Sequence, residues 1–435
     1  MYSSLPFLTD ADPVTSGEGA LDPLGLSPLG DRLAEEILPG LRARMSHPRF
    51  LTAMAVASAV CEGIEDSLAS DHVTPAYIVF EWLLVSGFVR APDRSLSKGT
   101  PGTFKAREAK EAGDPMCART YLRSPGVFGF HGVYKPLARK LNIVDDDMRL
   151  SENGVALLKI WEKEQGLTGF LNGTLSPGQG KQERESLRHA VEDALKVGQT
   201  TRSQGWSGWA WLASHLAPSN ARNRERVFIS GLLQEGDPMR SEIFRALEGR
   251  FGVQVEESAI VNSLLKSKVS APLRDRLLAI QRYEEVALLL EEAFDWIRLM
   301  STHAGARAIS SVEFSLKPRA VEISKLLRPT FELADSALGE VSPTLQRRLL
   351  ELANSFLHVT TAEELFHALL THHSVIQQNK QPDGKRDWFE RSIDEAAFVR
   401  PQYQLADIDS PRTAWNRPYR LHSVLSFLTD LETNT

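Results

Sequence analysis

The stretch GVYKPLARKLNIVDDDMRLSENGVALLKIW, residues 132–161, decides how the first half of the chain is expected to fold. VYKPLARKLN has the composition of a helix, and IVDDDMRL after it begins with β-branched residues that favour a strand. Ser151 is a good N-cap for a second helix, which ENGVALLKIWEKEQG would form. The sequence therefore predicts a helix, a short strand and another helix here.

Positive charge is concentrated just before this unit and in its first helix. Residues 90–140 contain eleven Lys/Arg and only four Asp/Glu, although the whole chain of 435 residues has a formal net charge of −6. Phosphate neutralisation supplies most of the non-specific affinity of proteins for nucleic acid, so a basic surface here indicates such a contact. The acidic chain as a whole argues against a protein that coats nucleic acid over its entire surface.

Residues 74–165 resemble a winged-helix module, in which one helix enters the major groove and a β-hairpin wing lies beside it. LARKLNIV is similar to the helix and first wing strand of bacterial regulators with this fold, and MRLSENGVALLKIWE to their second strand and closing helix. The resemblance implies that the DNA-facing cations are Arg119, Arg123, Lys135, Arg139 and Lys140.

Two features depart from that family. Asp145, Asp146 and Asp147 would place three acids on the wing, where phosphate repels them, and Pro136 suits the start of a helix better than its middle. Winged-helix units also mediate protein contacts. A solvated charged face beside a small packing domain is the alternative interpretation.

The remaining pattern predicts a mainly α-helical protein in two parts. Residues 1–30, rich in turn signals, are expected to be a flexible lead-in, and residues 31–170 a helical winged-helix-like domain. Residues 168–180, rich in Gly, Ser and Pro, are interpreted as a linker. Residues 181–435 would form a larger helical domain with an irregular C-terminal segment, and its candidate helices are 181–197, 205–217, 220–234, 238–249, 272–303, 316–338 and 343–371.

Three tryptophans, Trp206, Trp209 and Trp211, lie within six residues. Exposed, they could stack on bases or hold a partner, and the basic run ARNRER at 221–226 would suit phosphate. Buried, they would fill the space between helices, which is the interpretation that the sequence favours.

The C-terminal half holds the residue types of a possible enzyme. His367, His372 and His373 lie near Glu363 and Glu364, but their spacing does not gather them on one helical face, so we expect no metal. QPDGKRDWFE contains Asp383, Lys385 and Glu390, residue types that metal-dependent nucleases use, without the strand framework of such enzymes. A turn that presents Lys385 and Arg386 to phosphate or to a partner is the preferred interpretation.

Other classes are excluded by absent motifs. The chain has no GxxxxGK[ST], no GxGxxG between a strand and a helix, and no GxSxG, so no nucleotide or nicotinamide cofactor is expected. Two cysteines, Cys61 and Cys117, and the lack of a signal-peptide pattern favour a cytoplasmic protein. No apolar segment is long enough for a membrane span.

The sequence thus predicts a non-catalytic DNA-associated or adaptor subunit of a larger bacterial assembly, for which genome defence is one setting. Its expected partners are double-stranded DNA and other protein subunits. The first alternative is a metal-dependent nuclease or other enzyme with a site near His372, Asp383 and Lys385. The second is a helical protein-interaction scaffold that binds no DNA.

Overall fold

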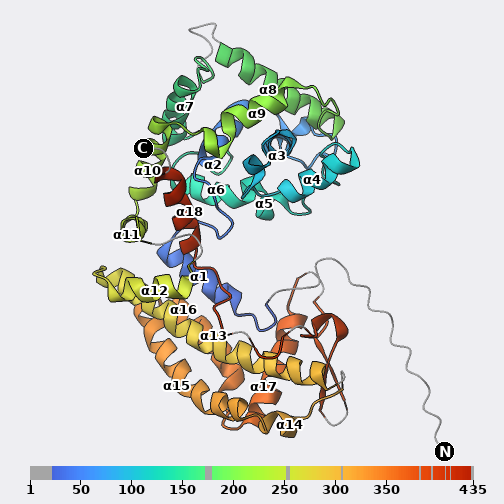
Figure 1. Ribbon diagram of the computed structural model, residues 1–435, viewed down its shortest axis with the longest axis vertical. Helices are drawn as coiled ribbons and strands as arrows, with labels where there is room; N and C mark the ends of the chain where they lie inside the picture. Colours follow the sequence, from blue (N-terminus) through green and yellow to red (C-terminus); the bar gives the residue numbers. More distant parts are fainter. Residues whose placement is uncertain are drawn as a thin grey trace, which may run out of the picture. The chain divides into compact units, whose positions relative to one another are not determined.

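The computed structural model describes residues 22–171, 179–250, 255–304, 307–381, 384–392, 395–406, 408–411 and 413–432. Within these residues the fold is mainly α-helical, as predicted, with eighteen α-helices and one two-stranded sheet (Figure 1). None of the described helices has both the length and the apolar character that crossing a bilayer requires.

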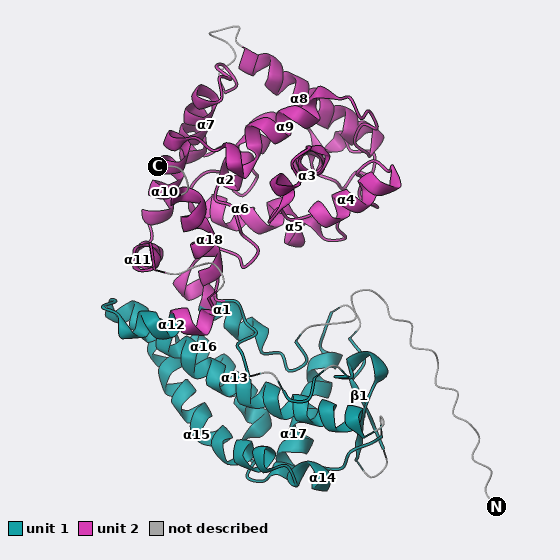
Figure 2. Ribbon diagram, viewed as in Figure 1, with its two compact units in different colours: residues 1–33, 261–418 teal, residues 34–260, 419–435 magenta. Residues whose placement is uncertain are grey.

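The chain forms two compact units (Figure 2). Unit 1 contains residues 1–33 and 261–418, and unit 2 contains residues 34–260 and 419–435. Residues 172–178 of the segment interpreted as a linker lie outside the described residues, and the chain on both sides of them belongs to unit 2. The helix after this segment packs against two earlier helices of the same unit, so the chain does not divide there.

Unit 2 holds most of the helices. They are α2 (Phe50–Cys61), α3 (Ala76–Arg90), α4 (Thr103–Ala112), α5 (Pro125–Phe128), α6 (Phe130–Lys140), α7 (Glu152–Glu164), α8 (Gln179–Val197), α9 (Ser207–Leu216), α10 (Asn223–Gln234), α11 (Pro238–Leu247) and α18 (Leu421–Glu432), with the short 3₁₀ helices η1 (Asp66–Leu68), η2 (Arg94–Ser97) and η3 (Pro218–Asn220). The division between the units falls within α1 (Ser27–Ile37) and α12 (Glu257–Lys266).

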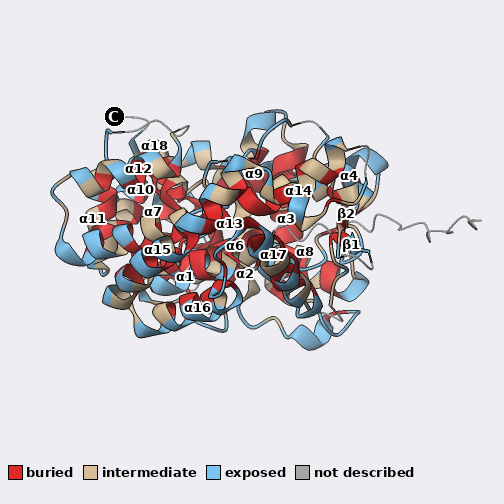
Figure 3. Cartoon of the chain, turned by 90° about the horizontal axis from the view of Figure 1, so that it is seen from below, coloured by how far each residue is buried: buried red, intermediate tan, exposed pale blue. Residues whose placement is uncertain are grey.

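The centre of unit 2 is formed by α2 and α3. Both are apolar nearly all round, and every residue of α2 except its last is buried. A helix without a polar face must be covered on all sides. α3 accordingly packs against α2, α4, α6, α8 and α9, and the buried positions are red in Figure 3.

A buried ion pair fastens α10 to the start of α2. Arg49 donates from Nε to Glu225 Oε1 at 3.1 Å and also donates to the carbonyls of His215 and Ala217. Thr52 donates to the same carboxylate oxygen at 2.6 Å. Both charged side chains are almost fully buried, so removing one partner would leave an uncompensated charge in the core.

Unit 1 is built on two long helices. Its elements are α13 (Ala271–His303), α14 (Ser311–Ser315), α15 (Pro318–Val341), α16 (Pro343–Ala353), η4 (Asn354–Phe356), α17 (Ala362–Gln378), the antiparallel strands β1 (Phe389–Arg391) and β2 (Ala397–Val399), and η5 (Pro401–Tyr403). α13 packs along α15 and also against α17 and β2. The buried Arg417 binds Glu284 and Glu291 of α13, each at 2.6 Å, and so attaches the irregular C-terminal segment to this helix.

Residues 22–30, predicted as part of a flexible lead-in, contribute to the fold of unit 1. The Asp22 carboxylate accepts the backbone N–H groups of Leu26 and Ser27, both at 2.8 Å. The side chains of Leu24 and Leu26 are buried. Helix α1 therefore begins four residues before the predicted boundary at Asp31. The rest of the predicted lead-in, residues 1–21, lies outside the described residues.

Candidate nucleic-acid interface

Helix α6, the predicted DNA-contacting helix, begins at a buried carboxylate. Glu81 of α3 accepts the backbone N–H groups of Phe130 at 2.8 Å and His131 at 2.9 Å, and it also accepts the Tyr121 hydroxyl. The His131 ring lies 2.8 Å away through Nδ1. Gly129 permits this approach, because a Cβ there would collide with Glu81. Glu81 and His131 are both almost fully buried.

This arrangement closes the first turn of α6 to an outside ligand. Recognition helices contact base edges with their N-terminal residues. Here Phe130 and His131 are buried, and α5 packs beside them. The exposed cations of α6, Arg139 and Lys140, lie at its C-terminal end.

The segment predicted as a wing is a tight turn that folds back on α6. A single bridge joins Val144 to Leu150, in place of the expected pair of strands. Asp145 Oδ1 accepts the backbone N–H groups of Asp147 at 2.9 Å and Arg149 at 2.8 Å, which holds the turn closed. The Arg139 guanidinium forms an ion pair with Asp146.

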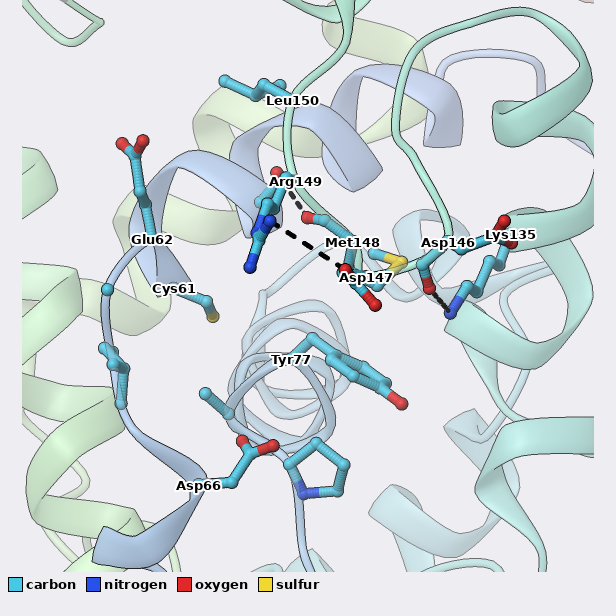
Figure 4. Close-up of a pocket in the computed structure, with 15 residues that line it drawn as sticks. Cys61, Glu62, Asp66, Tyr77, Lys135, Asp146, Asp147, Met148, Arg149 and Leu150 are labelled. Carbon is cyan, nitrogen blue, oxygen red and sulfur yellow. Dashed lines mark hydrogen bonds and ion pairs between the residues drawn. The ribbon is translucent and has the colours of Figure 1, made fainter.

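Lys135 is engaged by the same turn. Its ammonium donates to the backbone carbonyl of Asp146 at 2.8 Å and lies 5.8 Å from the centre of the Tyr77 ring (Figure 4). Two of the five cations that the winged-helix resemblance indicated, Lys135 and Arg139, are thus already bound within the protein.

A hollow of 740 Å³ lies between this turn, α2 and the start of α3 (Figure 4). Four carboxylates and two cations line it: Glu62, Asp66, Asp146, Asp147, Lys135 and Arg149. Burial, together with the charge of Asp66, raises the pKa of Tyr77 at its floor. Because carboxylates outnumber cations, this hollow repels phosphate.

Elsewhere in unit 2, two loops are hydrogen-bonded to each other. We call residues 113–124, between α4 and α5, and residues 198–206, between α8 and α9, the linked loops. The Met116 N–H donates to Thr200 Oγ1 at 3.1 Å, and the Thr200 N–H donates to the Met116 carbonyl at 2.9 Å. An antiparallel bridge joins Cys117 to Gln199 beside these bonds.

The linked loops carry three exposed arginines, Arg119, Arg123 and Arg202. Among the described residues, none of the three side chains has a hydrogen-bond or ion-pair partner. Although burial opposes ionisation of Cys117, hydrogen bonds with Thr120 and the charge of Arg119 lower the pKa of its thiol. The charge of Arg119 thus acts on the thiol of Cys117 in the same loop, after the hydrogen bonds of Thr120.

The eleven cations of residues 90–140 fall into two groups, engaged and unengaged. Six side chains are engaged within the protein: Arg90 with Gln204 and Trp209, Lys105 with Glu108, Arg107 with Ser97, Lys110 with the Val89 carbonyl, and Lys135 and Arg139 with Asp146. In the described part of the chain, the five without a side-chain partner are Arg94, Lys98, Arg119, Arg123 and Lys140.

The tryptophan cluster has two environments. Trp209 and Trp211 are buried, as the core interpretation predicted, and Arg90 lies 4.9 Å from the Trp209 ring centre. Trp206 is only half-buried and meets Trp209 edge-on, with 4.6 Å between ring centres. Of the three, Trp206 alone is open enough to receive a ligand.

The histidines proposed for an enzyme serve packing in unit 1. His372 lies 2.9 Å from both Ser355 Oγ and the Leu24 carbonyl. The His373 ring accepts the backbone N–H of Trp388 at Nε2 and lies 2.9 Å from the Pro23 carbonyl at Nδ1. Both rings are buried, and burial lowers the pKa of each. Neither ring has a nitrogen left for a metal or a substrate proton.

The other predicted residues of unit 1 are dispersed. Lys385 and Arg386 follow α17, with Lys385 half-buried and Arg386 exposed, whereas Asp383 lies outside the described residues. His367 Nδ1 instead lies 3.2 Å from the carboxylate of Glu395. In the described ranges no three His, Cys, Asp or Glu side chains are placed to hold a metal ion.

Sequence reasoning missed Glu81 and Arg202. Glu81 carried a usable signal, because an acid inside the apolar run AYIVFEWLLVSGF is rarely buried without partners. Arg202 carried none, since its importance depends on a contact between loops more than eighty residues apart.

Comparisons with known proteins add no relative. No protein-family model matches the chain, and neither the curated proteins nor the solved structures include a significant match.

Proposed function

We propose that this protein is a non-catalytic, nucleic-acid-associated adaptor whose contact surface is formed by the linked loops of unit 2. The observation that carries the proposal is the set of exposed arginines Arg119, Arg123 and Arg202 without partners in the described structure. They lie on two loops that hydrogen bonds hold together.

Arginine is suited to this role. Its planar guanidinium binds phosphate oxygens through two N–H groups and stays charged at all physiological pH values. A cation that already binds a carboxylate gains little from phosphate, because the existing pair must first break. The linked loops are therefore favoured over α6, where Asp146 occupies Arg139.

The adaptor interpretation is preferred over the nuclease for a separate reason. The rival site depended on His372 and His373, and the ring nitrogens of both are used in bonds that hold α17 to residues 23–24 and to Trp388. A general base or metal ligand needs a free lone pair.

Salt-dependent binding to duplex DNA tests the proposal. Each phosphate contact contributes about −0.9 to the slope of log affinity against log salt, so three arginines predict a slope near −2.7. We expect the Arg119→Ala/Arg123→Ala/Arg202→Ala variant to lose most of this slope, measured by fluorescence anisotropy between about 50 and 200 mM salt. The matched control is Lys135→Ala/Arg139→Ala, which removes two basic residues that are already engaged and should bind like the parent.

Two results would overturn the proposal. If the triple variant binds with the parent's affinity and slope, the contact lies elsewhere. If the parent shows no salt-dependent binding at all, the protein-interaction scaffold is the better interpretation.

A further inference from the structure

We propose that the hollow beside Trp206 receives an unpaired nucleobase, so that the linked loops bind single-stranded nucleic acid. The inference rests on the proposed function, because the same loops would supply the phosphate contacts, and it adds the class of ligand. The hollow has a volume of 470 Å³, within the range of about 300–1,000 Å³ typical of ligand sites.

The walls of the hollow come from α8 and the second linked loop. Trp206 supplies an aromatic ring, and its partner Trp209 is anchored by an indole N–H bond of 2.9 Å to the Ser203 carbonyl. An aromatic side chain of this kind stacks on any base, because every base has a π face. The ring is held in place by Trp209 and by close packing on Gly208, so stacking requires little reorganisation.

Polar side chains also line the hollow beside the Trp206 ring. Ser186, His189 and Asp193 lie on one face of α8 at spacings of three and four residues and line the hollow, and Gln199 lines it from the loop. None of these four side chains has a partner among the described residues. A carboxylate accepts from the exocyclic amino group of a base, and hydroxyl, imidazole and amide groups bind its ring nitrogens and carbonyls.

Charge favours a nucleotide over an apolar peptide side chain. Arg202 lines the hollow, and Gln199 and Thr200 of its wall are joined to Met116 and Cys117, close in the chain to Arg119. A strand with its base on Trp206 would have a cation at the hollow and others on the neighbouring loop. The hollow beside the 144–150 turn, with four carboxylates and two cations, offers no such match.

The test compares an oligothymidylate with a blunt duplex of equal length, again by fluorescence anisotropy. We expect Trp206→Ala to weaken binding of the oligothymidylate by roughly 5- to 150-fold, the equivalent of one stacked base, and to weaken duplex binding much less, because paired bases cannot stack on the ring. Trp206→Phe should retain most of the affinity, because a phenyl ring also stacks.

A second variant guards against a local loss of structure at the start of α9. Ala190→Phe fills the hollow from α8 while Trp206 stays in place, and it should weaken single-strand binding in the same way. The control is Gln182→Phe, which adds the same ring at an exposed position of α8 outside the hollow and should change nothing.

The outcomes separate this inference from the proposed function. If Trp206→Ala and Ala190→Phe leave single-strand affinity unchanged while the triple arginine variant weakens both ligands, the hollow does not hold a base and the proposed function stands. An identical loss on duplex and single strand would also overturn the inference. If the parent binds neither nucleic acid, both ideas fail, and a peptide of a partner protein becomes the better occupant.

Discussion

The α6 region and the linked loops both carry several cations, but the loops leave all three of their arginines available, whereas Lys135 and Arg139 of α6 are already engaged in the described structure. Beside α6, the Asp145 carboxylate accepts backbone N–H groups that close the 144–150 turn, and Asp146 forms an ion pair with Arg139. On the linked loops, Arg119, Arg123 and Arg202 face no carboxylate in an ion pair of the described structure. Local net charge is therefore a poor guide to a binding surface, because tight turns decide which charges are already neutralised.

Removing the buried carboxylate of Glu81, which holds the first turn of α6, is expected to have the largest effect. Glu81→Ala leaves two backbone N–H groups, the Tyr121 hydroxyl and the His131 ring without their acceptor in the core. We expect the free energy of unfolding to fall by about 3–5 kcal/mol, measured by urea denaturation. Glu81→Gln keeps the volume and one acceptor oxygen, so its effect should be smaller.

Glu108→Gln on α4 is the control, since its exposed ion pair with Lys105 contributes little. A loss below about 1 kcal/mol for Glu81→Ala would mean that the α6 region does not depend on this network.

The buried histidine His373 extends the comparison to unit 1. The backbone N–H of Trp388 donates to Nε2 of His373. The neutral ring therefore carries its proton on Nδ1, which faces the Pro23 carbonyl. Burial lowers the pKa of His373 from 6.5 to about 4. In the unfolded chain the His373 ring binds a proton near pH 6.5, whereas in the folded protein it does so only near pH 4. The free energy of unfolding should therefore fall by about 3 kcal/mol as the pH is lowered over this range.

The measurement is the urea midpoint as a function of pH for the parent and for His373→Gln, whose amide does not titrate. Much of the fall between pH 6.5 and 4 should disappear in the variant. His189→Gln, which makes the same substitution at an exposed position, is the control. A parent whose stability does not fall in acid would show that His373 is accessible to protons, and would reopen its candidacy as a catalytic base.

Periodicity predicted the helices well and their partners poorly. The expected helix 272–303 is α13 within one residue, and Ser151, the expected N-cap residue, lies directly before α7. Caps and apolar spacing are local, so one sequence contains them. The expected helix 343–371 is instead interrupted between α16 and α17. The capping box of Thr361 and Glu364 begins α17 as a separate helix. Its residues are visible in the sequence, but the helical pattern continues on both sides of them and favours a single helix.

Sequence reasoning identifies only some of the residues of the candidate site. The winged-helix resemblance indicated Arg119 and Arg123, which lie on the first linked loop. It also indicated Lys135 and Arg139, because a linear pattern does not show the turn that brings Asp146 back to α6. Arg202 joins the site through the bonds between Met116 and Thr200, a contact across eighty-four residues that no local pattern encodes.

The smallest effect provides the sharpest test of the comparison itself. Asp146→Asn/Asp147→Asn removes the carboxylates that pair with Arg139 and Arg149 while keeping side-chain size. All of these side chains are exposed, so stability should change by less than about 1 kcal/mol. If these ion pairs prevent the α6 region from binding phosphate, the variant should bind duplex DNA more tightly than the parent. Its slope of log affinity against log salt should be steeper by the equivalent of up to about two phosphate contacts. The same variant in a background lacking Arg139 and Arg149 should gain nothing. A double variant that binds DNA like the parent would show that α6 is withheld by its buried first turn and by shape, and that charge pairing is not the reason.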